Sequence, residues 1–283
     1  MGLDLSAIAA RRQAFKALHA SGCFVIPNPW DTGSARYLQG LGFKALATTS
    51  SGLAWSRGQP DGGLSRDVVL EHLRELVAAT DLPVNADFES GYASDAKGVA
   101  ESVRLAIETG VAGLSIEDAS GDAAQPIRPL DEALERLRAA RRAIDDAGGE
   151  VLLVGRAENF LHGVRDLDDT IARLKAYAQA GADCLYAPGI ATAQEIAAVV
   201  AAVAPKPVNL LIGATSALTL QEVAALGVRR ISVGGALARA AWGGFMRGAQ
   251  AIAEHGRFDT AFADAASGQA LNAFFRGGAG HKL

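Results

Sequence analysis

The chain has 283 residues, of which 49% are hydrophobic and 20% charged, and its formal net charge is -4. This composition is typical of a globular protein with a large core, and the small net charge gives no sign of nucleic-acid or membrane-surface binding. No apolar run approaches the ~18 residues of a membrane span, and no signal segment follows Met1, so the sequence predicts a soluble cytoplasmic protein. Cys23 and Cys184 lie far apart in apolar runs and are predicted to be buried free thiols.

Short apolar segments alternate with segments of helical periodicity along the chain. Strands are predicted over 23–26, 45–50, 83–89, 113–116, 151–154, 184–187, 207–212 and 230–235. Helices are predicted over 5–21, 32–41, 65–80, 94–110, 131–147, 167–180, 192–203, 219–226, 236–255 and about 258–275. The glycine-rich segment 55–63 and the polar segment 119–129 are predicted to be loops.

The strands are nearly all apolar, which is the pattern of a sheet that is buried on both faces. Regular alternation of strand and helix predicts parallel strands joined by right-handed crossovers. About eight such units over this length favour a (β/α)8 barrel, with the segment 236–275 as extra C-terminal helices. No G-x-G-x-x-G motif follows a strand, so dinucleotide binding is not indicated. We therefore expect one barrel domain over residues 1–283.

Acidic residues end the third strand of this barrel, at Asp87 and Glu89. On an extended strand, residues two apart point to the same side, so the two carboxylates are predicted to project together. Their oxygens are ligands that a hard cation such as Mg²⁺ prefers. The alternative is a strand end with two solvated acids.

The other strand ends carry further polar residues, and the active site of such a barrel lies at these ends. Arg156 ends the fifth strand and offers a planar fork to a substrate carboxylate, unless it forms a rim ion pair with Glu117 or Glu158. Asn209 lies in the seventh strand, where it could bind substrate or satisfy backbone groups. Asp61 lies in the glycine-rich loop and could instead cap a turn. Backbone N–H groups of one further segment can cradle an anion: Ser51, Gly52 and Leu53.

These motifs together resemble the phosphoenolpyruvate mutase/isocitrate lyase superfamily, in the branch related to 2-methylisocitrate lyase. The matching segments run in family order between about residues 20 and 245, as an ordered set of short motifs typical of such a family. They are the segments 51–53, 58–62, 86–92, 116–118, 155–158, 180–183, 187–189 and 226–232.

The resemblance implies a barrel that uses Mg²⁺, with Mn²⁺ as an alternative, to bind a 2-oxo acid or its enolate. It implies that Asp87 contacts the metal and that the other acids act largely through metal-bound waters: Glu89, Asp61 and Glu117. It assigns the substrate clamp to Arg156 and the substrate-binding cradle to Ser51, Gly52 and Leu53. We expect Glu158 and Asn209 to contact substrate, and Glu117 and Asp61 to join Arg156 in catalysis. The family exchanges its last barrel helix between subunits, which implies a homodimer or homotetramer.

Three segments depart from the family pattern. Glu89 replaces the usual second aspartate of Asp-x-Asp-x-Gly. The lid segment 119–129 contains none of the Cys, Lys and His of the lyases, nor the asparagine of the mutase. After Asn209, the Thr-Glu of the lyases is replaced by Leu210-Leu211-Ile212-Gly213. The general acid and base are thus left open between a metal-bound water, Glu117, Glu158 and a lid residue such as Asp122.

The sequence therefore predicts a Mg²⁺-dependent lyase that cleaves a carbon–carbon bond of a small 2-oxo or 2-hydroxy di- or tricarboxylate through an enolate. One alternative is phosphorus–carbon chemistry on a phosphonate or phosphoenol acid, as a mutase or a hydrolase. Another is a barrel that binds oxo acids without catalysis. The alternatives stay open because fold alone does not decide between such functions. In each case the expected partner is a small carboxylate or phosphonate, with neither nucleic acid nor membrane involved.

Overall fold

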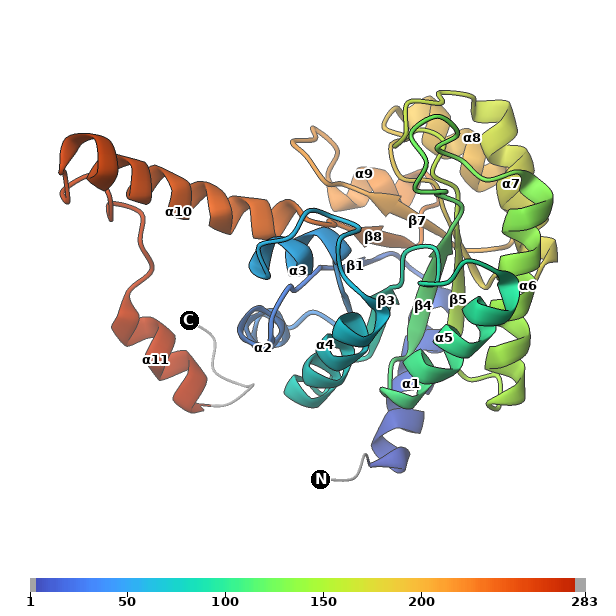
Figure 1. The fold of residues 1–283 in the computed structure, drawn as a ribbon, viewed down its shortest axis with the longest axis horizontal. Helices are drawn as coiled ribbons and strands as arrows, with labels where there is room; N and C mark the ends of the chain where they lie inside the picture. The colour runs from blue at the N-terminus through green and yellow to red at the C-terminus, as the bar shows by residue number, and fades with distance from the viewer. Residues whose placement is uncertain (1–3, 278–283) are drawn as a thin grey trace.

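Eight short parallel strands form the centre of the computed structural model, which describes residues 4–277 (Figure 1). The strands are β1 Phe24–Ile26, β2 Leu46–Ala47, β3 Val84–Asp87, β4 Gly113–Glu117, β5 Leu152–Arg156, β6 Cys184–Tyr186, β7 Val208–Leu211 and β8 Arg230–Ser232. Neighbouring strands bond in the order β1-β8-β7-β6-β5-β4-β3-β2. The remaining seam is bridged where the Ala47 N–H donates to the Pro27 carbonyl at 3.0 Å. The predicted (β/α)8 barrel is confirmed.

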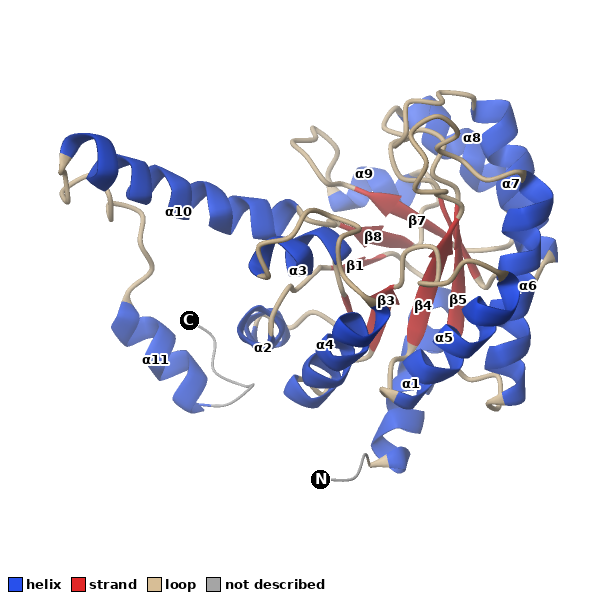
Figure 2. Cartoon of the chain, in the orientation of Figure 1, coloured by secondary structure: helices blue, strands red, loops and turns tan. Residues whose placement is uncertain are grey.

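Helices surround the strands on the outside, as Figure 2 shows in blue around the red strands. Their order along the chain follows the predicted alternation, since each strand after β1 is reached through at least one helix. They are α1 Leu5–Ala20, α2 Thr32–Gly40, α3 Ser50–Ser56, α4 Arg66–Ala79, α5 Ala96–Glu108, α6 Leu130–Asp146, α7 Leu167–Gln179, α8 Ala193–Val203, α9 Leu220–Ala225, α10 Ala236–His255 and α11 Gly268–Gly277.

Two local expectations were wrong. Residues 50–56 form α3, although we expected residues 45–50 to be a strand followed by a loop. The Thr49 side chain begins this helix by accepting a hydrogen bond from the Gly52 N–H, which is the usual role of an N-cap threonine. The second error is the segment after α10, where residues 256–267 are loop and turns and α11 begins only at Gly268.

Capping side chains explain where several helices begin. Asp31 and Ser34 form a reciprocal capping box at the start of α2, and Thr192 and Glu195 form one at the start of α8. In each, a side chain satisfies a backbone N–H that has no partner within its helix. The barrel core is then built from the apolar strands and the inner faces of α4 to α8.

The helix α10 differs from the helices before it, because it runs away from the barrel, and the chain then turns back so that α11 lies below it (Figure 1). Phe274 of α11 contacts Tyr37 of α2, with ring centroids 5.2 Å apart. Only Ala238 and Gly248 of α10 are buried. Its large apolar side chains Trp242, Phe245 and Met246 are 38%, 63% and 51% exposed. None of the helices between residues 4 and 277 combines the length and apolar character needed to cross a membrane.

His72 on α4 makes the stability of the fold dependent on pH. Its side chain is 2% exposed, and Nε2 has no hydrogen-bond partner among the described residues. Burial, followed by the nearby Arg57 charge, lowers the pKa of His72 to about 4. The unfolded side chain has a pKa of about 6.5, so as the pH falls from 6.5 to 4 the unfolded state binds a proton and the folded state does not. Proton binding therefore favours the unfolded state in this range.

We therefore expect acidification from pH 7 to pH 5 to remove about 2 kcal/mol of unfolding free energy through His72 alone. Urea denaturation at the two pH values would measure this loss. His72→Leu should reduce the loss by about the same amount, since it removes the titrating group. An identical pH dependence in the two proteins would contradict this account.

Candidate active site

Arg156, the last residue of β5, lies among carboxylates from three neighbouring segments. Its Nη1 lies 3.1 Å from Asp87 Oδ1 and 3.2 Å from Glu117 Oε2, and its Nε pairs with Glu158 Oε1. The guanidinium carbon also lies 5.1 Å from the centre of the Tyr186 ring. Burial by itself would lower the pKa of Arg156, but the surrounding carboxylates raise it well above its usual value. The side chain is therefore a fixed cation at the carboxyl end of the barrel.

Asp87 ends β3 and is held by groups on both of its oxygens. Oδ1 faces Arg156, and Oδ2 accepts a hydrogen bond from the Ser50 N–H at the start of α3, at 3.1 Å. The Asp87 N–H donates to Thr48 Oγ1 at 2.8 Å, which joins β3 to the end of β2. Asp87 thus has a defined orientation toward Arg156, and the carboxylate suits the positive end of a helix.

Glu117 ends β4 and pairs in register with Arg156 on β5. Burial raises the pKa of Glu117 well above its usual range, even though Arg156 opposes this shift, and the nearby Glu158 and Asp87 carboxylates raise it further. The charge count comes from the contacts themselves, because three carboxylates, Asp87, Glu117 and Glu158, pair with this single guanidinium.

Glu89 reaches the cluster by a different path from the predicted one. The strand ends at Asp87, and Glu89 has a φ of 44°, in the left-handed region. The alternation of an extended strand therefore does not apply to this pair. The Tyr92 hydroxyl donates to Glu89 Oε1 at 2.7 Å. Burial raises the pKa of Glu89 to about 7, and repulsion from Asp87 adds to the shift.

Glu158 supports Arg156 from behind. Its side chain is 2% exposed, and Oε2 lies 3.5 Å from His162 Nε2. The Glu158 N–H donates to Asp118 Oδ1 at 2.8 Å, and Asp118 in turn accepts from the Tyr177 hydroxyl at 2.6 Å. Glu158 does not line the cavity over Arg156. Glu158 is therefore placed to position Arg156. Its location outside the cavity gives no support to the predicted contact between Glu158 and substrate.

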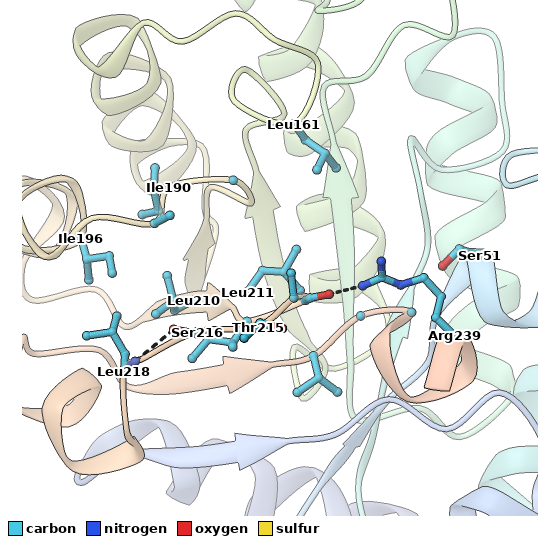
Figure 3. A pocket seen from close by; sticks show the side chains of 18 of the residues that line it. Ser51, Leu161, Ile190, Ile196, Leu210, Leu211, Thr215, Ser216, Leu218 and Arg239 are labelled. Carbon is cyan, nitrogen blue, oxygen red and sulfur yellow. Dashed lines mark hydrogen bonds between the residues drawn. The ribbon is translucent and has the colours of Figure 1, made fainter. Parts of the chain in front are cut away.

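A polar cavity of about 170 Å³ lies over Asp87 and Arg156. A second and larger cavity, of about 590 Å³, lies beside it (Figure 3). Asp61, which is exposed, lines both of them. The two cavities share one set of lining residues: Ser51, Asp61, Leu161, Leu211, Gly234 and Gly235.

The predicted backbone cradle is only partly available. Ser51 lines both cavities, whereas Gly52 and Leu53 line neither. The Gly52 N–H bonds to Thr49 Oγ1 at 3.3 Å, and the Leu53 N–H bonds to the Thr49 carbonyl at 3.1 Å. A Cβ atom at Gly52 would lie 3.0 Å from Trp30 Cβ. The glycine thus allows α3 to pack closely, and no amide of Gly52 or Leu53 is left for an anion.

Asn209 is fully buried and belongs to a polar group in the barrel interior that includes Arg230, a residue the sequence argument missed. Asn209 Nδ2 donates to Ser232 Oγ at 2.9 Å, and Asn209 Oδ1 accepts from Arg230 Nε at 2.8 Å. Arg230 is 2% exposed and also lines the polar cavity. The available signal was an arginine inside an otherwise apolar strand, which is rare without a specific partner. Asn209 lines the same cavity, so it can still contact a ligand.

The lid segment forms a small closed hairpin. Ala119 and Ile127 pair as an antiparallel bridge, and the Ser120 N–H donates to the Pro126 carbonyl at 2.9 Å. Asp122 is exposed, and its Oδ1 accepts from the Ala124 N–H at 2.8 Å. It lines neither cavity. Asp122 is therefore placed as a turn residue, since Asp commonly bonds its own backbone in turns.

The predicted metal ligands form no complete ligand set. Within residues 4–277, no three His, Cys, Asp or Glu side chains are arranged to hold a metal ion by themselves. Mg²⁺, however, commonly uses one or two protein carboxylates and keeps several waters. Asp87 lines the polar cavity, whereas Glu117 does not line it and contacts Arg156, which pairs with three carboxylates in all. The donor set fits a hydrated hard cation held by few protein atoms.

Comparison with known proteins identifies the family. The sequence model of the phosphoenolpyruvate phosphomutase family matches residues 15–253. The chain belongs to this family. It is thereby a member of the phosphoenolpyruvate mutase/isocitrate lyase superfamily, as its motifs predicted.

Individual relatives cover most of the chain. An uncharacterised protein of Mycobacterium tuberculosis (strain ATCC 25618 / H37Rv) is 33% identical over 223 residues, which are 78% of this chain and 81% of that protein. An oxaloacetate decarboxylase of Bradyrhizobium sp. (strain ORS 278) is 32% identical over 200 residues, which are 68% of each. A solved structure from Burkholderia cenocepacia J2315, of a suspected lyase or mutase, is 52% identical with a TM-score of 0.91. It covers 95% of this chain and 97% of that one.

Proposed function

We propose that this phosphomutase-family barrel is a divalent-metal-dependent lyase that cleaves a carbon–carbon bond of a 2-oxo or 2-hydroxy di- or tricarboxylate. The observation that carries the proposal is Arg156 beside Asp87 and Glu117 at the base of a polar cavity. These three residues combine a group that binds a substrate carboxylate with oxygens that suit a hard cation. The similarity to an oxaloacetate decarboxylase supports this substrate class, since oxaloacetate is a 2-oxo dicarboxylate.

Arg156 has one free side for a substrate. Its Nε and Nη1 contact Glu158, Asp87 and Glu117, while Nη2 makes no hydrogen bond within the described residues. Nη2 can therefore donate to a substrate carboxylate without breaking the contacts that orient the side chain. Glu158, held by His162 and Asp118, keeps the guanidinium in place for this role.

Asp87 would hold Mg²⁺ or Mn²⁺, with Glu117 beside it and with Glu89 and Asp61 acting through waters. The bound cation would supply Lewis-acid stabilisation of the negative charge that develops on the substrate oxygens. Decarboxylation suits the remaining residues best, because CO2 leaves without a base and the enolate carbon can then take its proton from water. The lid segment 119–129 offers no Cys, Lys or His as a proton donor, whereas a retro-aldol cleavage requires both an acid and a base.

Calorimetric titration with oxalate, with and without Mg²⁺, tests the site directly. Oxalate resembles the enolate of pyruvate, so a site that stabilises the enolate should bind it tightly. We expect binding that depends on Mg²⁺ and weakens by on the order of 10²-fold or more in Asp87→Asn. Asp81→Asn, an exposed acid before the amino end of β3, should bind as the unchanged protein does.

Absence of oxalate binding in the unchanged protein, with and without Mg²⁺, would refute the proposal. If oxalate binds, the next experiment is to measure turnover of oxaloacetate and of related 2-oxo and 2-hydroxy acids. Turnover of phosphonopyruvate without turnover of any of these acids would instead favour phosphorus–carbon chemistry.

We also propose that the chain assembles as a homodimer or homotetramer through α10 and the residues after it, within the segment 236–275. The exposed side chains Trp242, Phe245 and Met246 support this, because contiguous apolar surface commonly marks an interface. Light scattering should give two or four times the mass of one chain, and Phe245→Asp should lower it. A monomeric mass for the unchanged protein would contradict the proposal.

A further inference from the structure

The larger cavity beside Arg156 is a chamber whose walls are mostly apolar. Its volume is about 590 Å³, within the range of roughly 300–1,000 Å³ that is usual for small-molecule sites. Figure 3 shows Ile190, Ile196 and Leu218 around one end and Leu210 and Leu211 along its side. The chamber is formed by the end of β7 and by segments that follow β2, β5, β6, β7 and β8.

The chamber is continuous with the polar cavity. Leu161, on the segment after β5, and Leu211, the last residue of β7, line both spaces, as do Ser51 and Asp61. The polar cavity alone has about 170 Å³, which is smaller than a usual ligand site. A ligand whose carboxylate binds Arg156 can therefore extend past Leu161 and Leu211 into the larger space.

The residues of the chamber also explain a departure in the sequence. The resemblance described above leads us to expect a Thr-Glu pair after Asn209, and this chain has Leu210 and Leu211 there. Ile212 follows and lines the chamber as well. The polar side chains of the chamber include Ser51 and Arg239, which lie away from the end formed by Ile190, Ile196 and Leu218. At that end an apolar substituent would gain from burial, and a polar one would lose hydration against apolar side chains.

We propose that the chamber binds an apolar substituent of the substrate, a branched alkyl or aryl group larger than methyl, on the carbon next to the 2-oxo or 2-hydroxy carbon. This inference rests on the proposed function for the binding of the carboxylate end. It narrows the substrate class from small dicarboxylates in general to those with a bulky apolar side group.

N-substituted oxamates test the chamber, because they keep the oxalate-like oxygens and add a group of chosen size. Titration of the full chain with Mg²⁺ should show N-isobutyl oxamate binding at least about tenfold more tightly than N-methyl oxamate, since each buried CH₂ contributes about 0.8 kcal/mol. Oxalate is titrated in parallel as the reference for the carboxylate end.

Two matched variants test whether the tighter binding of N-isobutyl oxamate arises at the chamber wall. Leu218→Gln adds a polar group to the chamber wall. It should remove most of the gain in binding affinity that the isobutyl group gives over the methyl group. Leu220→Gln makes the same change two residues later, at a side chain that is 48% exposed and does not line the chamber. It should leave the gain intact. Thermal unfolding of both variants checks that neither has lost its fold.

The outcomes separate this inference from the function on which it rests. If oxalate binds and the two oxamates bind equally, the chamber does not receive the substituent and the inference is overturned, while the proposed function stands. Equal loss of the gain in Leu218→Gln and Leu220→Gln would overturn it too, since the effect would not come from the chamber wall. If oxalate also fails to bind, the proposed function itself is refuted, and the inference with it.

Discussion

Replacement of Arg156 by lysine is expected to lower kcat/KM by on the order of 10²–10³-fold, as does the loss of one well-placed donor in other enzymes. Arg156 contacts Asp87, Glu117 and Glu158 at once through Nε and Nη1 and leaves Nη2 for substrate. A lysine ammonium is a single point charge, so it cannot keep these three contacts and also donate to a substrate carboxylate. The charge of the site is nevertheless kept, which limits the effect on folding.

Steady-state kinetics on the substrate found by screening would measure this loss, with oxalate titration as a second readout. Arg165→Lys is the matched control, because Arg165 follows the same strand but has a side chain 63% exposed that lines neither cavity. It should retain the activity of the unchanged protein. Full activity in Arg156→Lys would show that the reaction does not depend on the guanidinium.

Replacement of Arg136 by methionine is expected to cost about 3–5 kcal/mol of unfolding free energy. Arg136 lies on α6 and is 1% exposed, and its guanidinium hydrogen-bonds to the loop that follows Asp87 and Glu89. Its Nη2 donates to the Ser90 and Ala93 carbonyls at 2.7 Å each, and its Nη1 donates to the Ser94 carbonyl at 3.2 Å. Methionine would fill much of the space but leave three carbonyls without these donors.

Urea denaturation would give the free energy of unfolding for Arg136→Met and for its control, Arg138→Met. Arg138 is two residues along the same helix and exposed, so its replacement should change stability by less than about 0.5 kcal/mol. Arg136→Met should also weaken Mg²⁺-dependent oxalate binding, because the loop it holds carries Glu89. A loss similar to that of the control would mean that the loop keeps its shape without the guanidinium.

The barrel and the centre of its site could be predicted from the sequence for one physical reason. The carboxyl ends of parallel strands meet at one end of a barrel, so residues that end successive strands become neighbours. Asp87, Glu117 and Arg156 end β3, β4 and β5, and Glu117 and Arg156 pair directly in register. Their proximity followed from chain order alone, whereas the ligand roles assigned to them by resemblance remain to be tested.

Other parts of the site depend on contacts that no local pattern encodes. Glu89 joins the acids only because the chain turns through a left-handed residue, and the shape of that turn is held by Arg136, 47 positions later in the sequence. The Gly52 and Leu53 amides were assigned to an anion, but they bond to Thr49 inside α3. Arg230 and Asn209 form a hydrogen bond between the neighbouring strands β8 and β7.

The sequence by itself determined the alternation of strands and helices, the order of the strand ends and the family to which the chain belongs, because these depend on residues that are near one another along the chain. The tertiary structure alone decided which carboxylates touch Arg156, which amides remain free and where space is left. The apolar chamber is the clearest case. Its walls come from the ends of five different strands and the segments after them, so its volume exists only once the barrel has brought Leu161, Ile190, Leu211 and Val233 around one space.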